Sequence, residues 1–115
     1  MFSIFSKKKD SFVYDQAVIV NIDFAAQKTP SLDEIFKEVK ELERNIEGAL
    51  PPNSGIDGDD LAEDEAIVYI YGPNADAIFK AVEPILKKSA FDHITITLQY
   101  GLPDDPATKD KKFTL

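Results

Sequence analysis

The chain has 115 residues, the length of one ordinary domain, and its 43% hydrophobic and 30% charged residues are typical of a globular protein that folds in water. It has no cysteine and one histidine, His93, which excludes disulfides, thiolate metal sites, cysteine nucleophiles and sites built from several histidines. The net charge is −8, and between residues 10 and 108 seven basic residues stand against twenty acidic ones, so we expect no nucleic-acid partner.

Residues 1–16 are expected to form an N-terminal tag segment outside the folded domain. The stretch MFSIFSKKKD does not have the order of a secretory signal, because its lysines follow a short apolar stretch instead of preceding it. No apolar run reaches the length of a membrane span, so we expect a cytoplasmic protein. Phe2, Ile4 and Phe5 beside three lysines leave open a weak contact with an anionic membrane. The alternative is a frayed terminus or a segment packed on a neighbouring surface.

Residues 17–24, AVIVNIDF, predict a strand because apolar β-branched side chains alternate along them. A helix of about four turns is predicted next. Ser31 and Glu34 have the spacing of a capping box, and apolar residues follow in steps of three and four. Gly48 and the pair Pro51-Pro52 predict the end of this helix.

The acidic residues 53–65 predict a short irregular strand and a tight hairpin, which lead into a second strong strand at 66–71. Asn74 is a plausible N-cap for a second helix, in which Pro84 predicts a kink or a break. Residues 93–100, HITITLQY, alternate as a strand does. The last segment, 101–115, is expected to be a polar tail, with Phe113 and Leu115 holding it to a surface.

This order predicts a single α+β domain over residues 17–100. Right-handed connections place both helices on one face of a four-stranded antiparallel sheet, which is the ferredoxin-like split βαβ (β-α-β-β-α-β) with spatial strand order 4-1-3-2. The aliphatic faces of the strands are then expected to pack under the helices, at Val18, Val20, Ile22, Phe24, Val68, Ile70, Ile94, Ile96 and Leu98.

The opposite face of the predicted sheet is the surface where we look for function. It carries two tyrosines and two isoleucines, which is more apolar than a surface without a role requires. The expected interface residues are Ile19, Ile67, Tyr69, Tyr71, Thr95 and Thr97. Contact with a second copy of the chain is the first hypothesis, because symmetric homodimers are the commonest assemblies. The alternative is that the tag or the tail folds across this face.

The acidic run near the middle of the chain consists of Asp57, Asp59, Asp60, Glu63, Asp64 and Glu65. A calcium loop of the EF-hand type does not fit it, because Gly55 stands at a ligand position and a strand follows instead of a helix. We therefore expect no metal and no cofactor. The run is interpreted as a charged hairpin, or as an acidic docking surface for a basic protein partner.

A catalytic use of the same face depends on three residues. Asp23 and His93 are expected to be neighbours if the first and last strands pair, and Tyr69 is the possible third member. No sequence feature supplies a nucleophile or an oxyanion site beside them. The sequence also has no glycine-rich phosphate loop. We expect a protein that is not an enzyme, with these three residues as the catalytic candidates.

A resemblance rests on Asp57-Gly58, Asp64-Glu65, the stretch Tyr69-x-Tyr71-Gly72-Pro73 and Ala75-Asp76. With these motifs, residues 17–100 resemble small uncharacterised bacterial cytosolic proteins with a ferredoxin-like fold. The resemblance implies the fold and no activity. In composition alone, a small acidic chain without cysteine is similar to immunity proteins that neutralise basic toxins.

Three functional hypotheses follow from the sequence. The first is a non-enzymatic protein-interaction domain that self-associates through the open sheet face. The second is an acidic inhibitor or immunity-type protein that binds a basic protein. The third is a small enzyme or ligand-binding domain that uses the open sheet face.

Overall fold

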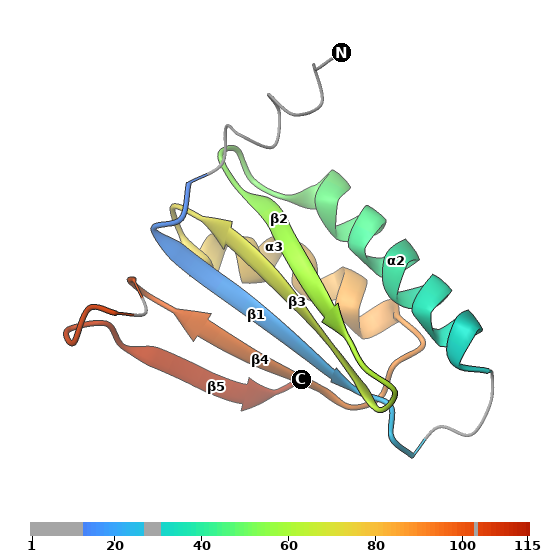
Figure 1. Ribbon diagram of the computed structural model, residues 1–115. Coiled ribbons are helices and arrows are strands. Elements are labelled where there is room, and N and C mark those ends of the chain that lie inside the picture. Colours follow the sequence, from blue (N-terminus) through green and yellow to red (C-terminus); the bar gives the residue numbers. More distant parts are fainter. Residues whose placement is uncertain (1–12, 27–30, 103) are drawn as a thin grey trace, which may run out of the picture.

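Figure 1 shows the computed structural model of the chain, which describes residues 13–26, 31–102 and 104–115. Its elements in chain order are β1 (Gln16–Asp23), α2 (Leu32–Ala49), β2 (Gly55–Leu61), β3 (Glu65–Gly72), α3 (Ala75–Lys88), β4 (Ile94–Gln99) and β5 (Asp110–Thr114). The five strands form one antiparallel sheet in the order β2-β3-β1-β4-β5, and both helices lie behind the same face of it. The expected α+β class is confirmed.

The sheet has five strands, so the prediction of four strands was wrong. The fifth strand, β5, lies in the segment that was expected to be a polar tail, and it pairs with β4 from Thr95–Thr114 to Gln99–Asp110. This strand was not predicted from the sequence, because it contains two lysines and lysine is uncommon in strands. An edge strand tolerates lysine, because one of its two edges pairs with no other strand and faces solvent.

The anchors of β5 are the two apolar residues at the end of the chain. The Phe113 ring meets the Phe79 ring of α3 edge-on, with 5.2 Å between the ring centroids. The Leu115 amide donates to the Ile94 carbonyl oxygen at 2.9 Å. Both side chains are partly buried against the core, so the expectation that they hold the tail to a surface is confirmed.

The hydrophobic core lies between the sheet and the helices. Alternate residues of β1, β3 and β4 are buried, and all nine residues that were expected under the helices belong to one buried cluster. The helices add to it the residues Ile35, Val39, Leu42, Ile46, Ala75, Ile78, Val82 and Leu86, spaced by three and four. Because one stripe of each helix is apolar, the helices cover one sheet face and leave the other open.

The helix boundaries follow the capping signals. Ser31 Oγ accepts a hydrogen bond from the Glu34 amide at 3.4 Å, and Asn74 Oδ1 accepts one from the Ala77 amide at 3.0 Å. The helix α2 ends at Ala49 because Leu50 precedes a proline and is extended. The helix α3 runs through Pro84 to Lys88, so the break expected at this proline does not occur. Pro84 is exposed, which places the lost backbone hydrogen bond on the solvent side.

The start of α3 lies very close to the end of β3. A Cβ atom added at Gly72 would lie 2.8 Å from Ile78 Cδ1 and would also meet Ser54 Oγ. Only a glycine fits there without displacing a neighbour.

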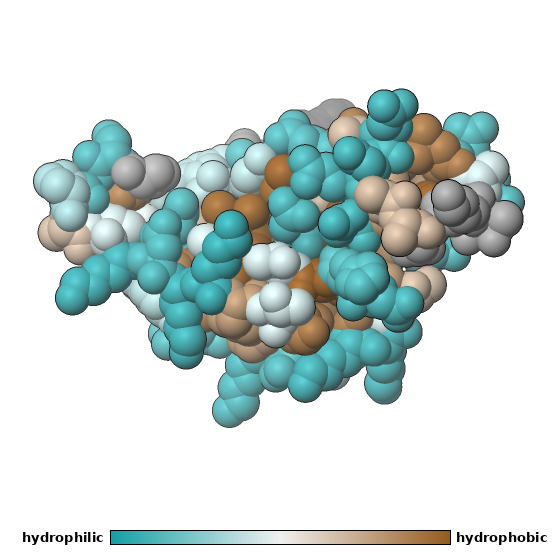
Figure 2. Space-filling model, turned by 90° about the horizontal axis from the view of Figure 1, so that it is seen from below, coloured by the Kyte–Doolittle hydropathy of each residue, from teal (hydrophilic) through white to brown (hydrophobic). Residues whose placement is uncertain are grey.

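Figure 2 shows the molecule from below, relative to the view of Figure 1. Hydrophobic residues reach the surface in the middle of this view and toward its right side, with hydrophilic residues between and around them. Within the described residues, no helix is both long and apolar enough to cross a membrane. Phe2, Ile4 and Phe5, the residues considered for a weak membrane contact, lie outside the described ranges.

Candidate functional site: the open face of the sheet

The face of the sheet opposite the helices is the candidate functional surface. The strand register aligns its side chains in rows across all five strands. One row consists of Gly58, Tyr69, Ile19, Thr97 and Lys112, and the next consists of Asp60, Ile67, Asn21, Thr95 and Thr114. The six residues expected in an interface all lie on this face, and all six are half-buried. The sequence therefore predicted the membership of this face correctly, and their role in an interface stays a prediction.

The described part of the tail does not fold across this face. It continues the sheet sideways as β5, with Phe113 turned toward the helix side. The first twelve residues, which include most of the expected tag, lie outside the described part of the chain.

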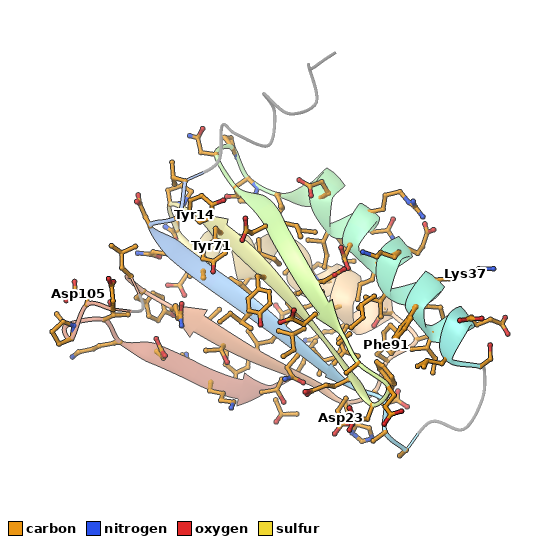
Figure 3. All side chains as sticks on the ribbon, in the orientation of Figure 1. Tyr14, Asp23, Lys37, Tyr71, Phe91 and Asp105 are labelled. Carbon is orange, nitrogen blue, oxygen red and sulfur yellow. The ribbon has the colours of Figure 1, made fainter. Side chains whose placement is uncertain are left out.

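One end of the open face carries a pair of tyrosines (Figure 3). The Tyr14 and Tyr71 rings lie with their centroids 4.8 Å apart and their planes at 53°. The Tyr14 hydroxyl donates to Asp57 Oδ1 at 2.9 Å. The register of β2 shifts between Ile56 and Gly58, so Asp57 occupies a bulge. This bulge places the carboxylate within reach of Tyr14.

The third tyrosine of this face, Tyr69, is also held by a carboxylate. Its hydroxyl donates to Asp60 Oδ2 at 2.8 Å. That hydrogen bond raises the pKa of Tyr69, because the carboxylate stabilises the protonated phenol. The ring is thereby fixed in one orientation before any partner arrives, and ordered tyrosines are frequent anchors of protein interfaces.

The centre of the open face is uncharged, whereas its margins carry charge. On β1, β3 and β4 the central rows hold Ile19, Asn21, Ile67, Tyr69, Thr95 and Thr97. The acids Asp60, Glu65 and Asp23 lie along two margins, and the β5 margin carries Asp110 and Lys112. An uncharged centre inside a charged rim is the usual anatomy of a protein interface.

The six acids expected to form one docking surface do not lie together. Asp57 and Asp60 turn toward tyrosines of the open face, and Glu65 accepts a hydrogen bond from Asn21 there. Asp59 turns to the helix side, because β-strand neighbours alternate between faces. Glu63 and Asp64 lie in the hairpin between β2 and β3.

Asp59 takes part in a charged cluster between β2 and α2 that sequence reasoning missed. Lys40 Nζ lies 2.7 Å from Asp59 Oδ2, which raises the pKa of Lys40. Glu43 stands beside the same aspartate, and its Oε2 is out of contact with solvent and accepts no hydrogen bond from a donor group. Burial, with help from Asp59, raises the pKa of Glu43 to about 7.

Glu43 lowers the pKa of Asp59, because a protonated Glu43 donates a hydrogen bond to the charged Asp59 carboxylate. These residues line a groove of about 370 Å³ between helix and strand. In the sequence, only one feature pointed to this cluster: Glu43 directly follows Leu42, a residue of the apolar stripe of the helix.

The three catalytic candidates do not assemble. The Asp23 amide donates to the His93 carbonyl oxygen at 2.8 Å, so the two residues are backbone neighbours as expected. The Asp23 side chain instead accepts a hydrogen bond from the Ala25 amide at 3.0 Å. Tyr69 pairs with Ile19, four residues along β1 from Asp23, which separates the two by about 13 Å. Figure 3 shows Asp23 at the end of the sheet opposite the tyrosine pair.

Among the described residues, no group of three or more histidine, aspartate or glutamate side chains is arranged to hold a metal ion. The chain was also compared with protein-family models, with curated proteins and with solved structures, and none of the three comparisons found a match. The resemblance noted from the sequence stays a prediction, and so does the cytoplasmic location.

Proposed function

We propose that this protein is a non-enzymatic interaction domain that binds a second copy of itself through the open face of the sheet. The observation that carries this proposal is the half-buried, uncharged centre formed by β1 and β3, where two isoleucines lie beside a tyrosine. Leaving such a surface in water costs free energy that contact with a similar surface recovers. The tyrosines are already ordered by Asp57 and Asp60, so less side-chain entropy is lost on binding.

We also propose that the domain is a ferredoxin-like split βαβ with one added strand. The order β4-β1-β3-β2, with both helices on one face, supports this assignment. The strand β5 extends the sheet beyond β4 and makes β1 its middle strand. The added strand widens the open face by the width of one strand, next to β4.

The alternative of an acidic domain that binds a basic protein has less support. It draws on the net charge of −8, which favours encounter with a basic surface. Its six acids, however, are divided among the open face, the helix side and a hairpin, and three of them already bond Tyr14, Tyr69 or Lys40. A catalytic domain has less support still, because Asp23 and Tyr69 are far apart.

The proposal is tested by measuring mass in solution with size-exclusion chromatography and light scattering over a wide range of concentration. We expect a dimer, and we expect Tyr69→Ala and Tyr71→Ala to weaken it by roughly tenfold or more, as loss of a tyrosine anchor in an interface does. Leu102→Ala is the matched control, because Leu102 is half exposed in the loop between β4 and β5, away from the rows of the face. Circular dichroism checks that each variant is folded.

A wild-type chain that stays monomeric at every concentration would refute the proposal. So would a dimer that Tyr69→Ala and Leu102→Ala weaken equally.

A further inference from the structure

The open face has a tall side and a low side. On β3 the side chains that point to this face include Ile67, Tyr69 and Tyr71, whereas on β4 they are Thr95, Thr97 and Gln99. In each row a large β3 residue and a smaller β4 residue flank the same residue of β1. Tyr69 and Thr97, for example, both pair with Ile19. The strand β1 therefore lies between a strand with bulky side chains on this face, β3, and a strand with smaller ones, β4.

β1 is also the middle strand of the sheet, with two strands on each side. A rotation by 180° about a line along β1 exchanges β3 with β4 and β2 with β5. The bulky strand β3 of one copy then lies over the smaller side chains of β4 of the other. Two sheets that fit together in this way can associate without a change in backbone conformation.

Building on the self-association proposed above, we infer that the two copies pack face to face about a twofold axis that runs along β1. Tyr69 then lies over the partner's Thr97, and Ile19 meets the partner's Ile19 on the axis. Each large side chain fills the space that a small one leaves, twice by symmetry. Sheets packed in this way lie about 10 Å apart with their strands roughly aligned.

The charges at the margins favour the same axis. The β2 margin of the face carries Asp60, which accepts from Tyr69, and the β5 margin carries Lys112 one row away. With the axis along β1, the β2 margin of each copy lies over the β5 margin of the other, so Asp60 comes within reach of the partner's Lys112. At both long margins of the interface Lys112 then faces an acid of the other copy, while Asp110 lies over the partner's Gly55.

The other face-to-face arrangement has its axis across the strands. It places β3 over the partner's β3 and β2 over the partner's β2. Tyrosines then oppose tyrosines while threonines oppose threonines, which leaves a gap over β4. The acids of the two β2 strands also come together, and like charges opposite one another destabilise an interface.

Spin labels on single cysteines distinguish the two axes, and the chain has no cysteine of its own. Lys112→Cys and Gly58→Cys place labels in one row at opposite margins, and a Cβ at Gly58 meets nothing within 4 Å. With the axis along β1, two labels at 112 are separated by four strand spacings, which with the gap between sheets is about 22 Å. A mixture of copies labelled at 58 and at 112 then has label pairs only about 10 Å apart.

We expect pulsed dipolar spectra of the 112-labelled dimer to show the long separation, and the mixture to show dipolar broadening that neither variant shows alone. Broadening in the 112-labelled dimer by itself, without broadening in the mixture, would overturn the axis while leaving self-association intact. Absence of any dimer in the unlabelled wild-type chain would refute the proposed function instead. Each labelled variant is first shown to be dimeric at the concentration used, because Lys112→Cys removes the charge that faces the partner's Asp60. Lys37→Cys on α2 is the labelled control away from the face.

Discussion

The carboxyl pair between α2 and β2 predicts an unusual dependence of stability on pH. The folded chain raises the pKa of Glu43 from 4.5 to about 7, so it holds this proton more tightly than the unfolded chain does. The stabilisation from Glu43 is therefore complete below pH 4.5. It declines as the pH rises from 4.5 to 7 and is lost above 7. Most acidic groups in folded proteins behave in the opposite sense.

The size of this contribution follows from the shift. A change of about 2.5 pH units, at about 1.36 kcal/mol per unit, gives a ceiling of about 3 kcal/mol. Glu43 is only half-buried, and the same hydrogen bond lowers the pKa of Asp59, so we expect solvent screening and this coupling to reduce it to about 1 kcal/mol. For a domain of this size, about 1 kcal/mol corresponds to a change in Tm of about 4–8 °C.

The variant Glu43→Gln tests this reasoning, because an amide donates to Asp59 at every pH. Urea unfolding followed by circular dichroism between pH 5 and pH 8 should show that the wild-type free energy of unfolding falls by about 1 kcal/mol relative to that of the variant. The control is Glu47→Gln, since Glu47 is exposed in the same groove. Equal pH profiles for wild type and Glu43→Gln would refute the protonated pair, as would a carboxyl titration of Glu43 by NMR with a midpoint near 4.5.

Three further predictions follow. Two copies with a net charge of −8 repel each other, so raising the salt from about 20 to about 200 mM should tighten the dimer several-fold in analytical ultracentrifugation. Weakening of the dimer would show that attraction between charges at the interface exceeds this net repulsion. Gly72→Ala should lower the free energy of unfolding by about 1–3 kcal/mol because its Cβ meets Ile78, whereas Gly58→Ala, with open space around it, should change it by less than about 0.5 kcal/mol; equal effects would show that the contact at Gly72 is not tight. Phe113→Ala should lower the free energy of unfolding by about 1–2 kcal/mol and should speed amide hydrogen exchange in β5 more than in the other strands. Unchanged exchange in β5 would mean that the ring contact does not hold the strand.

Most of the central fold was predictable because periodicity decides it. Alternation in β1, β3 and β4, and the capping residues Ser31 and Asn74, set both the elements and the face that each side chain joins. β5 was not predictable in the same way, because pairing with β4 and two aromatic rings decide its structure against the local preference of lysine.

The candidate site, too, was predictable only in part. The members of the open face follow from the period of two in strands, so they were predictable. The partners of individual acids were not, because a bulge at Asp57 and the position of α2 over β2 determine whether an aspartate meets a tyrosine or a lysine. Sequence neighbours such as Asp59 and Asp60 thus have unrelated surroundings.

The two outermost strands have a consequence for how large an assembly can grow. A bulge interrupts the ladder of β2, and β5 is short and carries two adjacent lysines. Neither margin offers a straight, neutral backbone on which a further chain can add a strand, so lateral polymerisation into ribbons or fibrils is disfavoured. Even at the high concentrations that drive association, we therefore expect finite particles and a clear solution rather than filaments.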